Sequence, residues 1–165
     1  MEQYMEHMVK KQTTMGDRAI RAVCIILLIL MAVGGWFVNP LLWFGAVIFF
    51  VVYRYVVYPN TDLEYEYLYV DRSLTVDKIM AKEKRKTIAT YELDRVELLA
   101  PANSSRLAEY RDKDLKTVGF WSLDTSDDHV PYAMIYEGGL KVLLDLPKDF
   151  VKIIQNNAPR KVFFD

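Results

Sequence analysis

The chain has 165 residues, a hydrophobic content of 52% and a formal net charge of −1. Because the chain is close to neutral, it has no overall basic field, which argues against a nucleic-acid-binding protein. Its single cysteine, Cys24, excludes a disulfide within the chain and a thiolate metal site.

The first distinctive feature is the segment 22–53, which carries no charged side chain. One membrane-spanning helix needs about 20 apolar residues. The segment is therefore too long for one helix and fits two, with a turn at Asn39 and Pro40. We expect helices over residues 18–38 and 41–58, with Asp17 as the N-cap of the first. Residues 47–52 are β-branched or aromatic, but a lone strand in lipid would leave its backbone unpaired, so a helix is favoured.

The two expected helices and the turn between them form a helical hairpin. The lysines and arginines around this hairpin predict its orientation in the membrane. Lys10, Lys11, Arg18 and Arg21 precede the first helix and Arg54 ends the second, whereas the link between the helices has no basic residue. The positive-inside rule therefore predicts a multi-pass protein of the plasma membrane with both termini in the cytoplasm. Aromatic side chains are expected at the two membrane interfaces: Trp36, Phe37, Trp43 and Phe44 outside, and Tyr53, Tyr55 and Tyr58 inside.

A cleaved signal peptide is the alternative interpretation of the first apolar stretch. Three features favour the hairpin over it. The segment before the stretch is long and contains acidic residues, no cleavage site of the A-x-A type follows, and a second apolar stretch comes at once.

The N-terminal segment 1–17 has a weak hydrophobic pattern. Tyr4, Met5, Met8 and Val9 would share one face of a helix. A short amphipathic helix on the inner leaflet and a frayed tail both remain open.

After Pro59 the hydrophobic period changes from that of a helix to two, which is typical of strands. Gly138 and Gly139 separate two apolar runs and predict a tight hairpin. From Pro147, apolar residues at helical spacing predict a final amphipathic helix. Seven strands are expected, over residues 63–70, 74–80, 87–91, 96–100, 115–123, 132–137 and 140–146.

Seven strands followed by a capping helix resemble the pleckstrin-homology (PH) fold. The segments 63–70 (LEYEYLYV), 74–79 (LTVDKI), 84–86 (KRK) and 158–163 (APRKVF), together with the hairpin, resemble a family of small uncharacterised bacterial membrane proteins with a transmembrane hairpin before a PH-like domain. The resemblance implies an α+β membrane protein: a cytoplasmic segment 1–17, a hairpin 18–58, and a cytoplasmic PH-like sandwich or barrel over 59–165. The family has no assigned activity that the resemblance could carry over to this chain.

The reactive residues of the sequence predict no enzyme, no metal site and no cofactor. The sequence has no phosphate-binding glycine motif and no set of nucleophile, base and orienting group. His129 lies beside Asp124, Asp127 and Asp128 and is the one metal candidate. Because this spacing matches no ligand pattern, a solvated loop is favoured.

The basic turn over residues 82–86 is the best candidate for a binding site. Anionic lipids attract a lysine or arginine near the membrane surface by about 1 kcal/mol each. An ordinary solvated turn, diluted by Glu83, is the alternative. The PH-type inositide site is not favoured, because the first hairpin turn, 71–73, is short and contains an acid. The candidate lipid-facing residues are Lys82, Lys84, Arg85 and Lys86, with Arg54.

These patterns predict a membrane-anchored, non-enzymatic PH-like interaction module at the cytoplasmic face. Its expected partners are the lipid bilayer, through anionic lipid, and other proteins of unknown identity, and assembly with identical copies stays open. The alternative is an accessory subunit of a larger membrane complex for transport or the envelope, with its helices as the partner surface.

Overall fold

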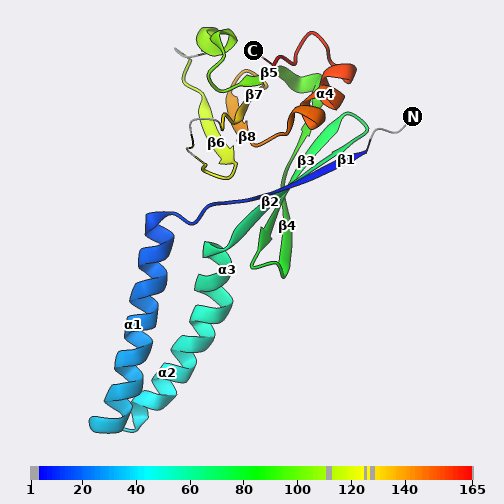
Figure 1. The fold of residues 1–165 in the computed structure, drawn as a ribbon. Coiled ribbons are helices and arrows are strands. Elements are labelled where there is room, and N and C mark those ends of the chain that lie inside the picture. The colour runs from blue at the N-terminus through cyan, green and yellow to red at the C-terminus, as the bar shows by residue number, and fades with distance from the viewer. Residues whose placement is uncertain (1–3, 111–112, 125, 127–128, 165) are drawn as a thin grey trace. The chain divides into compact units, whose positions relative to one another are not determined.

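The computed structural model describes residues 4–110, 113–124, 126 and 129–164 (Figure 1). The chain divides into two compact units. One consists of residues 12–63 and 80–84, and the other of residues 1–11, 64–79 and 85–165.

The first unit contains the two apolar helices. Helix α1 (Met15–Phe37) is followed by a continuous helical run over Leu41–Thr61, which comprises α2 (Leu41–Val52), a π-helical turn (Tyr53–Val57) and α3 (Tyr58–Thr61). Both helices are long and apolar enough to cross a membrane, and most of their large apolar side chains are exposed. The helical prediction for both stretches is confirmed.

Helix α1 begins one turn earlier than the sequence indicates. Thr14, and not Asp17, is the N-cap: its hydroxyl accepts a hydrogen bond from the Asp17 N–H at 3.2 Å. The Asp17 carboxylate in turn accepts from the Thr14 N–H at 3.0 Å. This is a reciprocal capping box, in which the acidic residue occupies the third helical position.

The β domain consists of two four-stranded sheets, in the orders β1-β2-β3-β4 and β5-β7-β8-β6, and the helix α4 (Lys148–Asn157) (Figure 1). This confirms the predicted fold class, with eight strands among the described residues in place of about seven. Short 3₁₀ helices lie at Leu93–Arg95 and Ser105–Tyr110. The strands are β1 (Met5–Lys10), β2 (Leu63–Val70), β3 (Ser73–Met80), β4 (Lys84–Glu92), β5 (Val96–Pro101), β6 (Lys116–Phe120), β7 (Tyr132–Tyr136) and β8 (Leu140–Leu144).

The additional strand is β1, where a helix or a frayed tail was expected. Both expectations are wrong, because β1 pairs with β2 in an antiparallel ladder that runs from Met5 opposite Tyr69 to Lys10 opposite Glu64. Its residues alternate between half-buried and exposed, the period of a strand. Since β1 precedes α1 and β2 follows α3, the helical hairpin is inserted between two neighbouring strands of one sheet.

The predicted hairpin between β7 and β8 is confirmed, with Glu137 and Gly138 at φ values of 50° and 65°. The other neighbour of β8 is β6, and these two strands run parallel to each other. The core contains buried side chains from both sheets and from α4, among them Tyr67, Val76, Val142, Phe150 and Ile154.

Candidate binding sites

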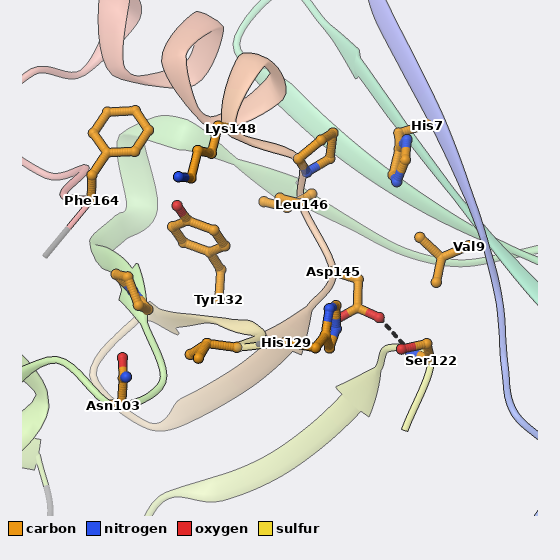
Figure 2. A pocket seen from close by; sticks show the side chains of 13 residues that line it. His7, Val9, Asn103, Ser122, His129, Tyr132, Asp145, Leu146, Lys148 and Phe164 are labelled. Atoms are coloured by element: carbon orange, nitrogen blue, oxygen red, sulfur yellow. Dashed lines mark hydrogen bonds and ion pairs between the residues drawn. The ribbon is translucent and has the colours of Figure 1, made fainter. Parts of the chain in front are cut away.

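A cavity of about 650 Å³ opens within the β domain (Figure 2). Its lining comes from β1, the end of β5 and the segment after it, the segment after β6, the beginning of β7 and the approach to it, the link between β8 and α4 with the first residue of α4, and Phe164. The polar lining residues are His7, Asn103, Ser122, His129, Tyr132, Asp145 and Lys148. Except for Tyr132 in β7, the polar side chains thus come from loops, strand ends, the edge strand β1 and the first residue of α4.

Asp145 is the buried centre of one wall. One carboxylate oxygen accepts from the backbone N–H of Ser122 at 2.6 Å, and the other accepts from Nε2 of His129 at 2.8 Å. Its own backbone N–H donates to the hydroxyl of Tyr67 at 3.2 Å. Asp145 therefore joins the ends of β6 and β8 to the segment before β7.

The three side chains Ser122, His129 and Asp145 are residue types found in hydrolase triads. In a triad the nucleophile is hydrogen-bonded to the base, which a third group orients. Among the described residues, no hydrogen bond joins His129 to the Ser122 hydroxyl, which instead accepts from the Asp124 N–H at 3.2 Å. The hydrogen bonds of Asp145 thus tie the segments that carry Ser122 and His129 to the end of β8.

His7 brings β1 to the same wall. Its ring stacks on Tyr67 with 6.3 Å between the centroids. Burial lowers the pKa of His7, against the opposing effect of the Asp145 charge. The buried hydroxyl of Tyr67 donates to the carbonyl of Phe120, and burial raises the pKa of Tyr67.

Lys148 and Tyr132 point toward one another in another part of the cavity, beside Phe164 (Figure 2). Tyr132 is only 7% exposed, and burial raises its pKa. Lys148 is the first residue of α4, whose N-cap, Pro147, supplies no side-chain hydrogen bond. A basic side chain, a hydroxyl and a helix start thus meet in one place.

The tip of the β3–β4 hairpin, residues 80–84, belongs to the compact unit that contains the apolar helices. The N–H of Ala81 donates to the carbonyl of Asp62 at 2.8 Å. Arg54 and Glu83 form an ion pair at 2.8 Å. Of the predicted basic residues, Lys82 and Lys84 therefore lie beside the C-terminal end of the second helix.

Arg85 makes different contacts from the neighbouring lysines. Its guanidinium binds Asp77 at 2.5 Å and also binds Glu66, and both carboxylates are buried. Burial, a hydrogen bond that the protonated Glu66 carboxyl donates to Glu6, and the charges of Glu6 and Asp77 raise the pKa of Glu66 in spite of Arg85. Lys86, the fifth predicted residue, lies exposed in β4.

The predicted interface aromatics lie on exposed or half-buried positions of the helices. Near the beginning of α1 and the end of the second helix, the guanidiniums of Arg21 and Arg54 lie 5.3 and 5.4 Å from the centre of the Tyr58 ring. The aromatics predicted for the outer interface are Trp36, Phe37, Trp43 and Phe44, and those predicted for the inner interface are Tyr53, Tyr55 and Tyr58.

The cavity leaves no pattern in the sequence that predicts it. The sequence places His129 beside Asp124, Asp127 and Asp128, the last two of which lie outside the described residues. Its carboxylate partner is instead Asp145, and no cluster suited to a metal ion occurs among the described residues. One signal was present in the sequence: Asp145 is an acid between Leu144 and Leu146, within an apolar run.

A family model described as "Bacterial PH-like domain (DUF6106)" matches residues 1–164. No curated protein and no solved structure matches the chain.

Proposed function

We propose that this chain, which belongs to the family of bacterial PH-like domains, is a membrane-anchored binding module whose β3–β4 tip contacts anionic lipid at the cytoplasmic face. Membership of a PH-like family suggests a binding module, because such domains are generally not catalytic. Two helices of membrane-spanning length and composition support an anchor. Protein partners held at the same face complete the proposed role.

The observation that carries the lipid contact is the attachment of the tip to the end of the second helix. The Ala81–Asp62 hydrogen bond and the Arg54–Glu83 ion pair hold it there. Because Glu83 is paired with Arg54, its carboxylate does not neutralise the charges of the exposed Lys82 and Lys84. Each lysine near an anionic surface contributes about 1 kcal/mol of attraction.

The pairing of β1 with β2 supports a location of the whole β domain on one side of the membrane. Both ends of the helical hairpin lead into adjacent strands of one sheet, which supports the proposal that both ends lie on the same side of the membrane. The basic residues before α1 and at the end of the second helix favour the cytoplasmic side.

Retention of lipids by the full-length protein tests the contact. The protein is purified in mild detergent, mixed with equal amounts of phosphatidylcholine and phosphatidylglycerol, and examined by native mass spectrometry. The wild type should retain more of the anionic lipid. The variant Lys82→Gln/Lys84→Gln/Lys86→Gln should lose that preference.

A matched control separates a local contact from total charge. Lys113→Gln/Lys116→Gln/Lys152→Gln removes the same charge from exposed positions elsewhere in the β domain. It should keep the preference for phosphatidylglycerol. Equal retention of the two lipids by the wild type, or equal losses in the two variants, would contradict the proposed contact.

A further inference from the structure

We propose that the cavity of the β domain binds a small organic anion, a carboxylate or phosphate monoester on a compact apolar body, with the anionic group between Lys148, Tyr132 and the start of α4. This site is independent of the lipid contact by the β3–β4 tip.

The hydroxyl of Tyr132 is the first observation that points to a ligand. The residue is 93% buried and its hydroxyl is directed into the cavity (Figure 2). Within residues 4–110, 113–124, 126 and 129–164, the hydroxyl has no hydrogen-bond partner. The hydroxyl oxygen is not among the fully buried polar atoms, so it is accessible from the cavity and can bond water or a ligand that enters there.

The start of α4 supplies further donors at the same place. The first helical hydrogen bond runs from the Val151 N–H to the Pro147 carbonyl at 3.1 Å, so the N–H groups of residues 148–150 have no partner within the helix. Pro147 provides no side-chain cap. The positive end of the helix dipole and free N–H groups both favour an anion. The ammonium group of Lys148 adds a full positive charge.

The carboxylate in the lining lies in another part of the cavity wall from Lys148 (Figure 2). Both oxygens of Asp145 accept hydrogen bonds there, one from His129 and the other from the Ser122 N–H. Asp149, the acid in the first turn of α4, is exposed and does not line the cavity. Among the described lining residues, Lys148 therefore carries the charge that a ligand can pair.

The remaining walls accommodate an apolar body. Val9, Val130, Leu146 and Phe164 line the cavity, and small-molecule sites usually have volumes of about 300–1,000 Å³. A ring or short chain fits the apolar part while its anionic group reaches Lys148 and Tyr132. Carboxylates and phosphates share this recognition chemistry, since both present only acceptor oxygens to the donors.

Calorimetric titration of the full-length protein in phosphatidylcholine nanodiscs tests the site. The probes are phenyl phosphate, benzoate and inorganic phosphate, with benzyl alcohol as the uncharged analogue. At least one of the two aromatic anions should bind with a dissociation constant below about 1 mM and more tightly than benzyl alcohol. Tighter binding of phenyl phosphate identifies a phosphate ester as the better ligand, and tighter binding of benzoate identifies a carboxylate. Weaker binding of inorganic phosphate supports a role for the apolar walls.

Three variants locate the binding. Tyr132→Phe removes one hydroxyl and keeps the buried ring, and it should weaken the affinity about tenfold, since the lost hydrogen bond is to a charged group. Lys148→Met should weaken it by a similar factor. Lys152→Met, an exposed lysine of the same helix, should leave the dissociation constant unchanged. Unchanged thermal midpoints show that the variants are folded.

Absence of binding of both aromatic anions by the wild type would overturn the proposal. So would equal dissociation constants for Tyr132→Phe, Lys148→Met and Lys152→Met. The Lys82→Gln/Lys84→Gln/Lys86→Gln variant should bind the probes as the wild type does, so loss of lipid preference and loss of anion binding are separate results.

Discussion

Lys10, the last residue of β1, lies opposite Glu64 at the beginning of β2, so the two strands that border the helical hairpin pair with each other. The hairpin is thus an insertion in a sheet, and not a leader in front of a separate domain. Residues on both sides of the apolar segments are required to complete the β domain.

The role of β1 in the β domain can be tested by one substitution on each face of this strand. Val9 packs against the core of the β domain, whereas Met8 is half exposed on the other face. Val9→Gln should lower the free energy of unfolding by about 1–3 kcal/mol, because it buries an unpaired amide. Met8→Gln should change it by less than about 0.5 kcal/mol. Equal effects in thermal or denaturant unfolding would contradict the pairing.

Much of the fold could be predicted because its signals are local. The tyrosines of residues 63–70 alternate with glutamates, and the Gly138–Gly139 pair predicts the β7–β8 turn. Strand β1 could not be assigned in this way, since Met5, Met8 and Val9 fit a helix as well as a strand. Its conformation depends on the edge of β2, more than 50 residues away in the chain.

The cavity could not be predicted for a related reason. His129 pairs with Asp145 across the whole β7–β8 hairpin, and Lys148 joins them through the position of α4. No motif spacing brings these residues together. The composition of residues 82–86 predicts a basic turn, but it does not predict that Arg85 binds the buried carboxylates of Glu66 and Asp77.

The buried carboxylate Glu66 predicts a pH effect on stability. Its raised pKa means that the folded domain holds a proton that the unfolded chain releases, so stability falls as the pH rises from about 4.5 through the folded value. Glu6, Asp77 and Arg85 surround it on the neighbouring strands. Glu66→Gln should therefore unfold at a higher temperature than the wild type at neutral pH, and the difference should shrink toward pH 4.5. A difference that does not vary with pH would contradict the assignment.

His7 predicts the opposite dependence of stability on pH, a loss of stability as the pH falls. Burial lowers its pKa, so the unfolded chain takes up a proton that the folded domain does not, and stability is lost as the pH falls below about 6.5. His7→Phe keeps a ring to stack on Tyr67 and removes this titration. Its loss of stability between about pH 7.5 and 5.5 should be smaller than that of the wild type. An equal loss in urea unfolding would show that His7 does not contribute.

Gly35 predicts how closely the two apolar helices pack. A Cβ at this position would lie 2.5 Å from Cδ1 of Trp43, which is shorter than any normal contact. Gly35→Ala should therefore force the helices apart and lower the thermal midpoint in detergent. Gly16→Ala, where the nearest atom is the Thr14 hydroxyl at 3.7 Å, is the matched control and should have little effect. The close helix contact is wrong if the two variants behave alike.

The most direct test of the central claim, that a helical hairpin holds the β domain at the cytoplasmic face, is cysteine accessibility in intact spheroplasts. Cys24→Ser removes the native thiol, and Asn39→Cys or Lys152→Cys then supplies one thiol in the turn between the helices or on α4. A membrane-impermeant maleimide should label Asn39→Cys in intact cells, and Lys152→Cys only after permeabilisation. Labelling of Lys152→Cys in intact cells would contradict the account.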